Sequence, residues 1–169
     1  MFVTPKGIFS KQELESEERT GALTVIVAHC SESKSVFAHA VPRKGADSAG
    51  YVIEQLKQDI LWLGHSRVVI KSDNEPSIVQ VVQALSAALK MAGVTSVSVE
   101  ASVPYDPQTN GAAESAVKMF KGTFRANVLT LERQIQARIP TDHPVMTWLA
   151  RHAAMLRTLR VKGADGLTA

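Results

Sequence analysis

The stretch VPYDPQTNGAAESAVKMFKGTFR, residues 103–125, begins as a turn and ends as a helix. Pro104 and Pro107 shape the turn, and the helix is expected to continue to about Ile139. A single carboxylate, Glu114, lies where the turn meets the helix, and a row of cations follows it. The pairing of a lone acid with a basic helix is the main functional clue in the chain.

The cations share one side of this helix with the acid. Lys118, Lys121 and Arg125 come four, seven and eleven positions after Glu114. At about 100° per residue all four fall within one narrow stripe. A separate apolar stripe is expected to face the core, and it consists of Ala113, Val117, Phe120, Phe124 and Leu131.

Two explanations of the stripe remain open from the residues alone. An i,i+4 ion pair between Glu114 and Lys118 is common on surface helices, but it leaves Lys121 and Arg125 unexplained. The functional alternative is a carboxylate that holds a divalent cation, beside cations that hold a phosphate backbone. The helix dipole also favours an acid in the first turns, so Glu114 has a structural explanation as well.

Strands and helices alternate through the rest of the chain. We expect strands at 22–30, 34–41, 67–73 and 96–102, and helices at 46–63, 76–92 and 143–161 besides the one quoted. The resulting order, β-β-α-β-α-β-α-α, predicts an α/β fold with a mixed sheet and helices on both faces. Residues 1–5 read as the end of an earlier strand, and 7–20 as a polar loop.

Bulk composition narrows the class of protein. The length of 169 residues favours one domain over 1–169. The apolar content of 45% and charged content of 21% are typical of a soluble globular domain. No apolar run suits a membrane span and no signal peptide is visible. With Cys30 as the single cysteine, an intrachain disulfide is excluded, so we expect a nuclear or cytoplasmic protein without a membrane partner.

The charge is uneven along the chain. Residues 1–114 hold 10 Lys and Arg against 13 Asp and Glu, which gives −3. Residues 115–169 hold 9 Lys and Arg against 3 Asp and Glu, which gives +6. The basic last third indicates a polyanionic partner, and a solvated basic helical face is an equally good explanation from charge alone.

Asp73 is the second acid of interest. It ends the predicted strand 67–73, at the edge of an α/β sheet where ligands bind. Its structural alternative is the N-cap of the helix 76–92. Carboxylates such as Asp73 and Glu114, together with water and phosphate oxygens, suit Mg²⁺. Paired metal ions of this kind assist phosphoryl transfer.

These motifs resemble a known family. SDNE after a strand, followed by PYDPQTNGAAES at the opening of a helix, is similar to the catalytic core of retroviral and LTR-retrotransposon integrases. The final WLARHAAMLRTLRVKGADGLTA resembles the tail of that core in retrotransposon polyproteins. The resemblance implies an RNase H-like fold and a D,D,E polynucleotidyl transferase. It also implies Mg²⁺ or Mn²⁺ as cofactor, DNA as partner and a homo-oligomer.

The resemblance assigns roles to individual residues. Asp73 matches the second catalytic aspartate and Glu114 the catalytic glutamate, so both are expected to be catalytic and metal-binding. The resemblance implies nucleic-acid binding by Asn74 beside that aspartate, by Tyr105, Gln108 and Asn110 in a mobile loop, and by Lys118 and Lys121 on the helix. Arg125 is expected to bind nucleic acid because it shares the stripe of these cations.

The sequence departs from the family pattern at three points. Glu75 and Pro76 stand where members often carry a glycine, and 40 residues, more than in retroviral members, separate Asp73 from Glu114. The family's first catalytic aspartate would fall just before Met1, so the first strand is expected to be truncated and the metal weakly held. The primary hypothesis is an integrase core that performs metal-dependent 3′-end processing and strand transfer. The alternatives are an inactive or domesticated nucleic-acid-binding module, and another RNase H-like nuclease or transposase.

Overall fold

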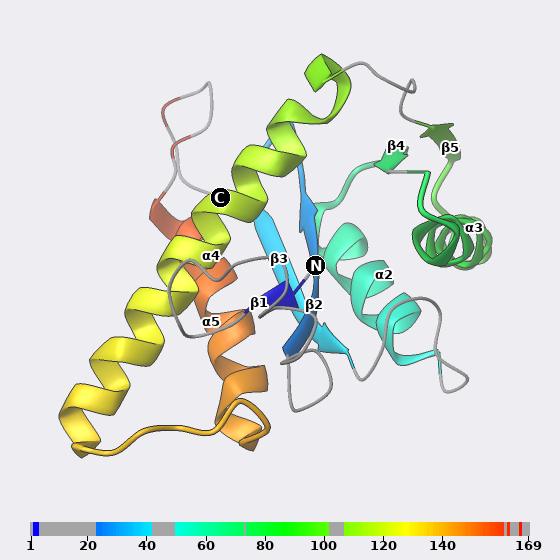
Figure 1. Cartoon of the computed structure of the whole chain (residues 1–169). Helices are drawn as coiled ribbons and strands as arrows, with labels where there is room; N and C mark the ends of the chain where they lie inside the picture. The colour runs from blue at the N-terminus through cyan, green and yellow to red at the C-terminus, as the bar shows by residue number, and fades with distance from the viewer. Residues whose placement is uncertain are drawn as a thin grey trace. The chain divides into compact units, whose positions relative to one another are not determined.

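The computed structural model describes residues 2–3, 23–41, 50–72, 74–101, 107–160, 162 and 166. The chain divides into two compact units (Figure 1). The first unit comprises residues 1–42 and 113–169, and the second comprises residues 43–112. The expectation of a single domain over 1–169 stays a prediction, and the predicted polar loop at 7–20 lies outside the described residues.

An antiparallel sheet forms one side of the first unit. Its strands are β1 (Phe2–Val3), β2 (Leu23–His29) and β3 (Val36–Val41), in the order β1-β2-β3. The β2–β3 register pairs Thr24 with Val41 and His29 with Val36, so the two strands predicted at 22–30 and 34–41 form a hairpin. The turn at 31–33 is closed by the N–H of Cys30, which donates to the carbonyl of Ser35 at 2.9 Å.

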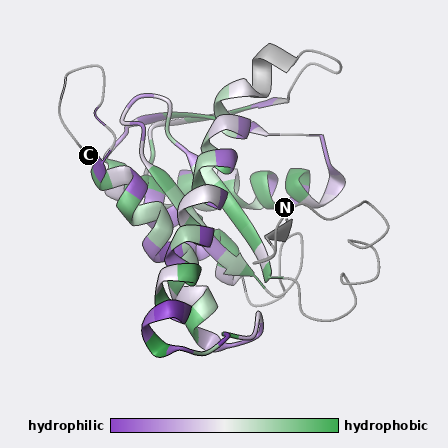
Figure 2. Ribbon diagram, turned by 60° about the vertical axis from the view of Figure 1, so that its left-hand side comes forward, coloured by the Kyte–Doolittle hydropathy of each residue, from purple (hydrophilic) through white to green (hydrophobic). Residues whose placement is uncertain are grey.

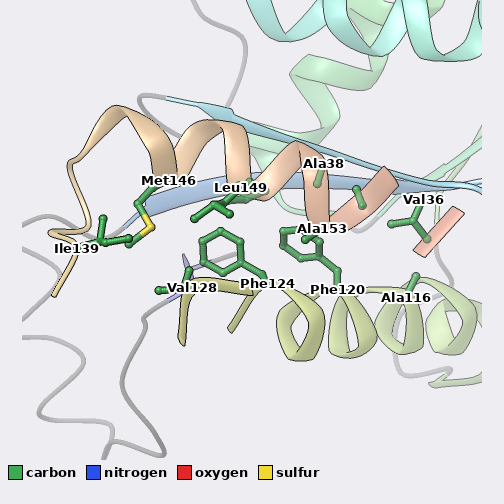
Figure 3. Close-up of a cluster of buried hydrophobic side chains, with 13 residues drawn as sticks. Val36, Ala38, Ala116, Phe120, Phe124, Val128, Ile139, Met146, Leu149 and Ala153 are labelled. Atoms are coloured by element: carbon green, nitrogen blue, oxygen red, sulfur yellow. The ribbon is translucent and has the colours of Figure 1, made fainter. Parts of the chain in front are cut away.

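Two helices complete the first unit. These are α4 (Pro107–Ile135), which belongs to this unit from Ala113 onward, and α5 (Pro144–Arg160). Apolar side chains from α4, α5, β2 and β3 form one buried cluster, in which the Phe120 and Phe124 rings stack with centroids 5.9 Å apart. In Figure 3 these two rings point from α4 toward Leu149 and Ala153 on α5. Figure 2 shows β2 and β3 as largely hydrophobic, whereas both helices carry hydrophilic and hydrophobic bands.

The buried face of α4 differs from the predicted one. Ala116, Phe120, Phe124 and Val128 are buried at intervals of four residues. Ala113 is exposed, and Val117 and Leu131 are half-buried, so the prediction was wrong for Ala113. Helices pack through such i,i+4 ridges, which run obliquely to the helix axis. The core stripe therefore shifts around the helix along its length.

The end of α4 also lies earlier than predicted, at Ile135 rather than near Ile139. Gln136 adopts a left-handed backbone conformation, with φ of 53°, which stops the helix. The chain then turns back, and the buried Glu132 carboxylate accepts a hydrogen bond from the N–H of Ile139 at 2.9 Å. This bond holds Ile139, 8% exposed, at the edge of the core.

The second unit contains two helices and a parallel pair of strands. Its elements are α2 (Tyr51–Leu63), β4 (Arg67–Ser72), α3 (Pro76–Met91) and β5 (Ser96–Ala101). Gly64 ends α2 in the left-handed conformation, with φ of 73°, directly after the predicted helix end at residue 63. In the β4–β5 register Arg67 pairs with Ser96 and Ser72 with Ala101, and α3 packs against both strands.

The described strands form two sheets rather than the single mixed sheet predicted from sequence. One sheet is antiparallel and the other parallel, so both kinds of pairing expected for the fold are present. The described part of the first strand, Phe2–Val3, contributes two residues to the antiparallel sheet. Both of these pair with β2, at Thr24 and Leu23.

Candidate nucleic-acid interface

The predicted acid and the three cations lie together on α4. Glu114 and Lys118 are exposed, and Lys121 and Arg125 are half-buried. The four side chains, with Val117 and Gly122, line a hollow of about 380 Å³. We call this set of six residues the α4 hollow. It lies on a different side of the helix from the ridge of Ala116, Phe120, Phe124 and Val128.

The cations of the α4 hollow are not neutralised by acids of the described chain. Within that part of the protein, ion pairs join Lys57 to Glu54, Lys71 to Glu100 and Arg138 to Glu132. No ion pair within the described residues involves Lys118, Lys121 or Arg125. The i,i+4 pair that offered a purely structural explanation of Glu114 and Lys118 is therefore not formed.

Arg125 also has an unsatisfied hydrogen-bond donor. Its Nε atom is shielded from solvent and has no hydrogen-bond partner among the described residues. Three cations and one carboxylate leave a net charge of about +2 in the α4 hollow at neutral pH. A row of cations without partners attracts polyanions and releases their counterions when it binds a phosphate backbone. The hollow is thus chemically suited to a phosphate backbone.

The other predicted nucleic-acid-binding residues are Asn74, Tyr105, Gln108 and Asn110. Asn74 is exposed and precedes α3 in the second unit, and Tyr105 lies outside the described residues. Gln108 and Asn110 are in the first turn of α4 and not in a loop before it, which corrects the expectation. The helix starts earlier because proline is favoured at the first helical position, and Pro107 occupies it.

Asp73 lies outside the described residues, but the start of α3 bears on its structural alternative. The N-cap position of α3 belongs to Glu75, with Pro76 following at the first turn. The hydroxyl of Ser77 donates a hydrogen bond to the Glu75 carboxylate at 2.9 Å. Glu75 occupies the N-cap position without a side-chain capping bond, and the two explanations of Asp73 stay predictions.

Glu114 is the one predicted metal ligand within the described residues. A carboxylate oxygen is a hard ligand of the kind Mg²⁺ prefers, and the exposure of Glu114 leaves it accessible. Among the described residues, no group of three or more His, Cys, Asp or Glu side chains could hold a metal ion. The described residues therefore supply one suitable ligand and do not by themselves fit a complete metal site.

One residue of the hollow was not singled out from the sequence. Gly122 is exposed in the middle of α4 and lines the hollow between the cations. The available signal was a glycine inside a helical pattern, which often has a packing or functional reason.

In the same described part of the chain, no helix is both long and apolar enough to cross a bilayer.

The fold is that of retroviral integrase catalytic cores. The catalytic core domain of BIV integrase matches with a TM-score of 0.52 and 20% identity, over 85% of this chain and 80% of that one. A chain of the simian T-cell lymphotropic virus intasome, in complex with a PP2A regulatory subunit, matches with a TM-score of 0.61 and 19% identity. The match covers 89% of this chain and 48% of the intasome chain, so this chain spans about half the length of the intasome chain.

The likeness lies in structure and not in close sequence relationship. The sequence matches no protein-family model and no curated protein. At about one-fifth identity, the structural matches establish the fold. The predicted RNase H-like α/β fold of an integrase catalytic core is therefore confirmed.

Proposed function

We propose that this chain is a DNA-integration core that binds DNA along α4 and joins DNA ends by strand transfer. The observation that carries the proposal is the α4 hollow, where three cations without carboxylate partners accompany Glu114 on a different side of the helix from the buried ridge. The integrase-core fold supports the same function, since the two structural neighbours are an integrase domain and an intasome.

The spacing of the cations suits a nucleic-acid strand. From Lys118 to Arg125 the helix advances about 10 Å, at 1.5 Å per residue. Consecutive phosphates of one strand of duplex DNA are separated by about 3.4 Å along the duplex axis. A strand running beside α4 would therefore bring a short run of successive phosphates within reach of Lys118, Lys121 and Arg125. Contacts of this kind fix the position of DNA without reading its sequence.

Glu114 lies at the N-terminal end of this row of cations, where the strand-transfer reaction would occur. In the proposed reaction a DNA 3′-hydroxyl attacks a target phosphodiester and displaces its 3′ oxygen. Asp73 and Glu114 would hold Mg²⁺ or Mn²⁺, which supplies charge neutralisation and a more acidic attacking hydroxyl. Asn74, Tyr105, Gln108 and Asn110 would position the DNA near these carboxylates. We expect the active form to be a homo-oligomer acting on element and target DNA.

A nucleic-acid-binding module without catalysis is the second candidate. DNA binding requires the α4 hollow, which lies within one unit and is fully described. DNA joining requires Asp73 as well, and a further carboxylate according to the family pattern. Binding can therefore persist in a chain that does not join DNA.

A strand-transfer assay with Mg²⁺ or Mn²⁺ separates the two candidates. The substrates are a labelled duplex with a recessed end and a plasmid target, and the variants are wild type and Glu114→Gln. The integrase function predicts joining by the wild type that Glu114→Gln abolishes while DNA binding is retained. DNA binding without joining in the wild type would instead favour the binding module. Loss of binding in Glu114→Gln would contradict the division of roles between acid and cations.

A further inference from the structure

Gly122 occupies an unusual place for a glycine. It is exposed and lies in the interior of α4, thirteen residues before the helix ends at Ile135. Apart from proline, glycine is the least favourable residue for a helix interior, since it loses the most backbone entropy on folding. Gly122 therefore destabilises the helix that carries the proposed DNA-binding cations.

Nothing within the described chain requires glycine at this position. Its backbone is helical and is not among the positive-φ residues, so an L side chain fits its conformation. A Cβ atom built on Gly122 would meet no atom within 4 Å apart from its two chain neighbours and the backbone of its own helix turns. Close packing, a tight turn and a left-handed backbone are the usual structural reasons for glycine, and none of them applies here.

The neighbours of Gly122 on the helix surface are cations. Residues three and four apart lie next to each other on a helix. Lys118 precedes Gly122 by four positions and Arg125 follows it by three, while Lys121 is adjacent in sequence. A side chain at position 122 would therefore stand between the two flanking cations. Its absence leaves open space that forms part of the α4 hollow.

We propose that Gly122 forms a notch in which one phosphate of the DNA backbone sits against α4, between Lys118 and Arg125. This inference rests on the proposed DNA-binding function and adds a positioning residue to it. The notch brings the phosphate closer to the helix than a side chain would allow, so both cations reach it together. Helix stability is lowered in exchange for this close approach.

The test combines stability and DNA binding in two variants of the full chain. Gly122→Ala and Gly122→Leu fill the notch to increasing extents and leave the charge unchanged. We expect both to raise the melting temperature, by about 2–4 °C for the alanine variant. We also expect weaker binding to a labelled duplex, more so for leucine. The slope of log Kd against log salt should fall by about 0.9, the value of one phosphate contact.

Thr130→Leu provides the matched control. Thr130 is exposed on α4, eight positions after Gly122, and does not line the hollow. The leucine adds bulk to the same helix at a point about 80° further around it. We expect wild-type affinity and wild-type salt slope for this variant. An equal loss of binding in Thr130→Leu would overturn the notch, because the effect would then not depend on position 122.

The remaining outcomes distinguish a failure of the Gly122 notch from a failure of the proposed DNA-binding function. If Lys118→Ala and Lys121→Ala weaken DNA binding while Gly122→Leu binds like wild type, the notch is wrong and the DNA interface stands. If the wild-type chain does not bind DNA, or the lysine variants bind as tightly as wild type, the proposed interface and the notch both fail. A stabilised Gly122→Ala with weaker binding and a reduced salt slope supports the notch.

Discussion

The Thr158 hydroxyl makes two hydrogen bonds to the backbone of Val36. It accepts from the Val36 N–H at 2.9 Å and donates to the Val36 carbonyl at 3.0 Å. Thr158 lies near the end of α5, and Val36 begins β3, an outer strand of the antiparallel sheet described here. A single side chain thus satisfies both backbone groups of Val36 and covers part of a strand edge.

Thr158→Val is expected to destabilise the first unit. Valine has nearly the same shape, so the buried backbone N–H and carbonyl of Val36 would lose their partners without a change in volume. Each unsatisfied buried group costs about 1–3 kcal/mol. Urea denaturation followed by circular dichroism measures the change. Thr158→Ser keeps the hydroxyl and serves as the control, and a stability loss as large as that of valine would contradict the account.

Glu132→Ala should loosen the turn that follows α4. The Glu132 side chain, 9% exposed, accepts from the Ile139 N–H at 2.9 Å and lies 3.4 Å from the Arg138 guanidinium. Loss of the acceptor leaves the buried N–H of Ile139 unpaired and lowers the free energy of unfolding by about 1–3 kcal/mol.

Two companion variants identify which partner of Glu132 matters. The side chain of Arg138 is 81% exposed, so Arg138→Ala should change stability by less than about 1 kcal/mol. Glu132→Gln retains an oxygen acceptor for Ile139 and should be milder than alanine. A larger effect of Arg138→Ala than of Glu132→Ala in denaturation experiments would show that the ion pair dominates.

His29 makes stability depend on pH. Burial lowers the pKa of His29, and the positive charge of Lys34 lowers it further. The unfolded chain therefore takes up a proton at a higher pH than the folded chain. The contribution of His29 is fully present above about pH 6.5, the ordinary pKa of histidine, and is lost as the pH falls through the lowered folded value.

His29→Gln should reduce this dependence. Its melting temperature, measured from pH 7.5 downward, should fall less steeply between pH 6.5 and the folded pKa than that of the wild type. Lys34→Gln removes the second cause alone and should have a smaller effect in the same direction. Parallel pH profiles for wild type and His29→Gln would contradict the assignment.

Much of the fold was predictable from local sequence signals. The β2–β3 hairpin follows from two apolar runs around the turn at 31–33, and Gly64 and Pro76 mark the end of α2 and the start of α3. The contact of Thr158 with Val36 was not predictable, because 122 positions separate the two residues. The same holds for the left-handed Gln136 that ends α4, since glutamine carries no signal for that conformation.

The candidate site was predictable to the extent that it depends on helix periodicity. The spacing of Glu114, Lys118, Lys121 and Arg125 placed them on one side of α4, and the structure brings them together around one hollow. The pattern did not show that the buried ridge would leave Ala113 exposed, because ridge packing depends on the partner helix. The roles of Asp73 and Tyr105 stay predictions, as do those of the other proposed DNA contacts.

The salt dependence of DNA binding shows whether α4 carries a DNA interface. Dissociation constants for a labelled duplex would be measured over a range of salt for the wild-type chain and for Lys118→Ala/Lys121→Ala. Removal of two phosphate contacts should weaken binding and lower the slope of log Kd against log salt by about 1.8. Lys90→Ala/Arg133→Ala removes the same charge outside the hollow and should keep a slope near that of wild type. Equal slopes for wild type and the Lys118/Lys121 variant would contradict a DNA interface on α4.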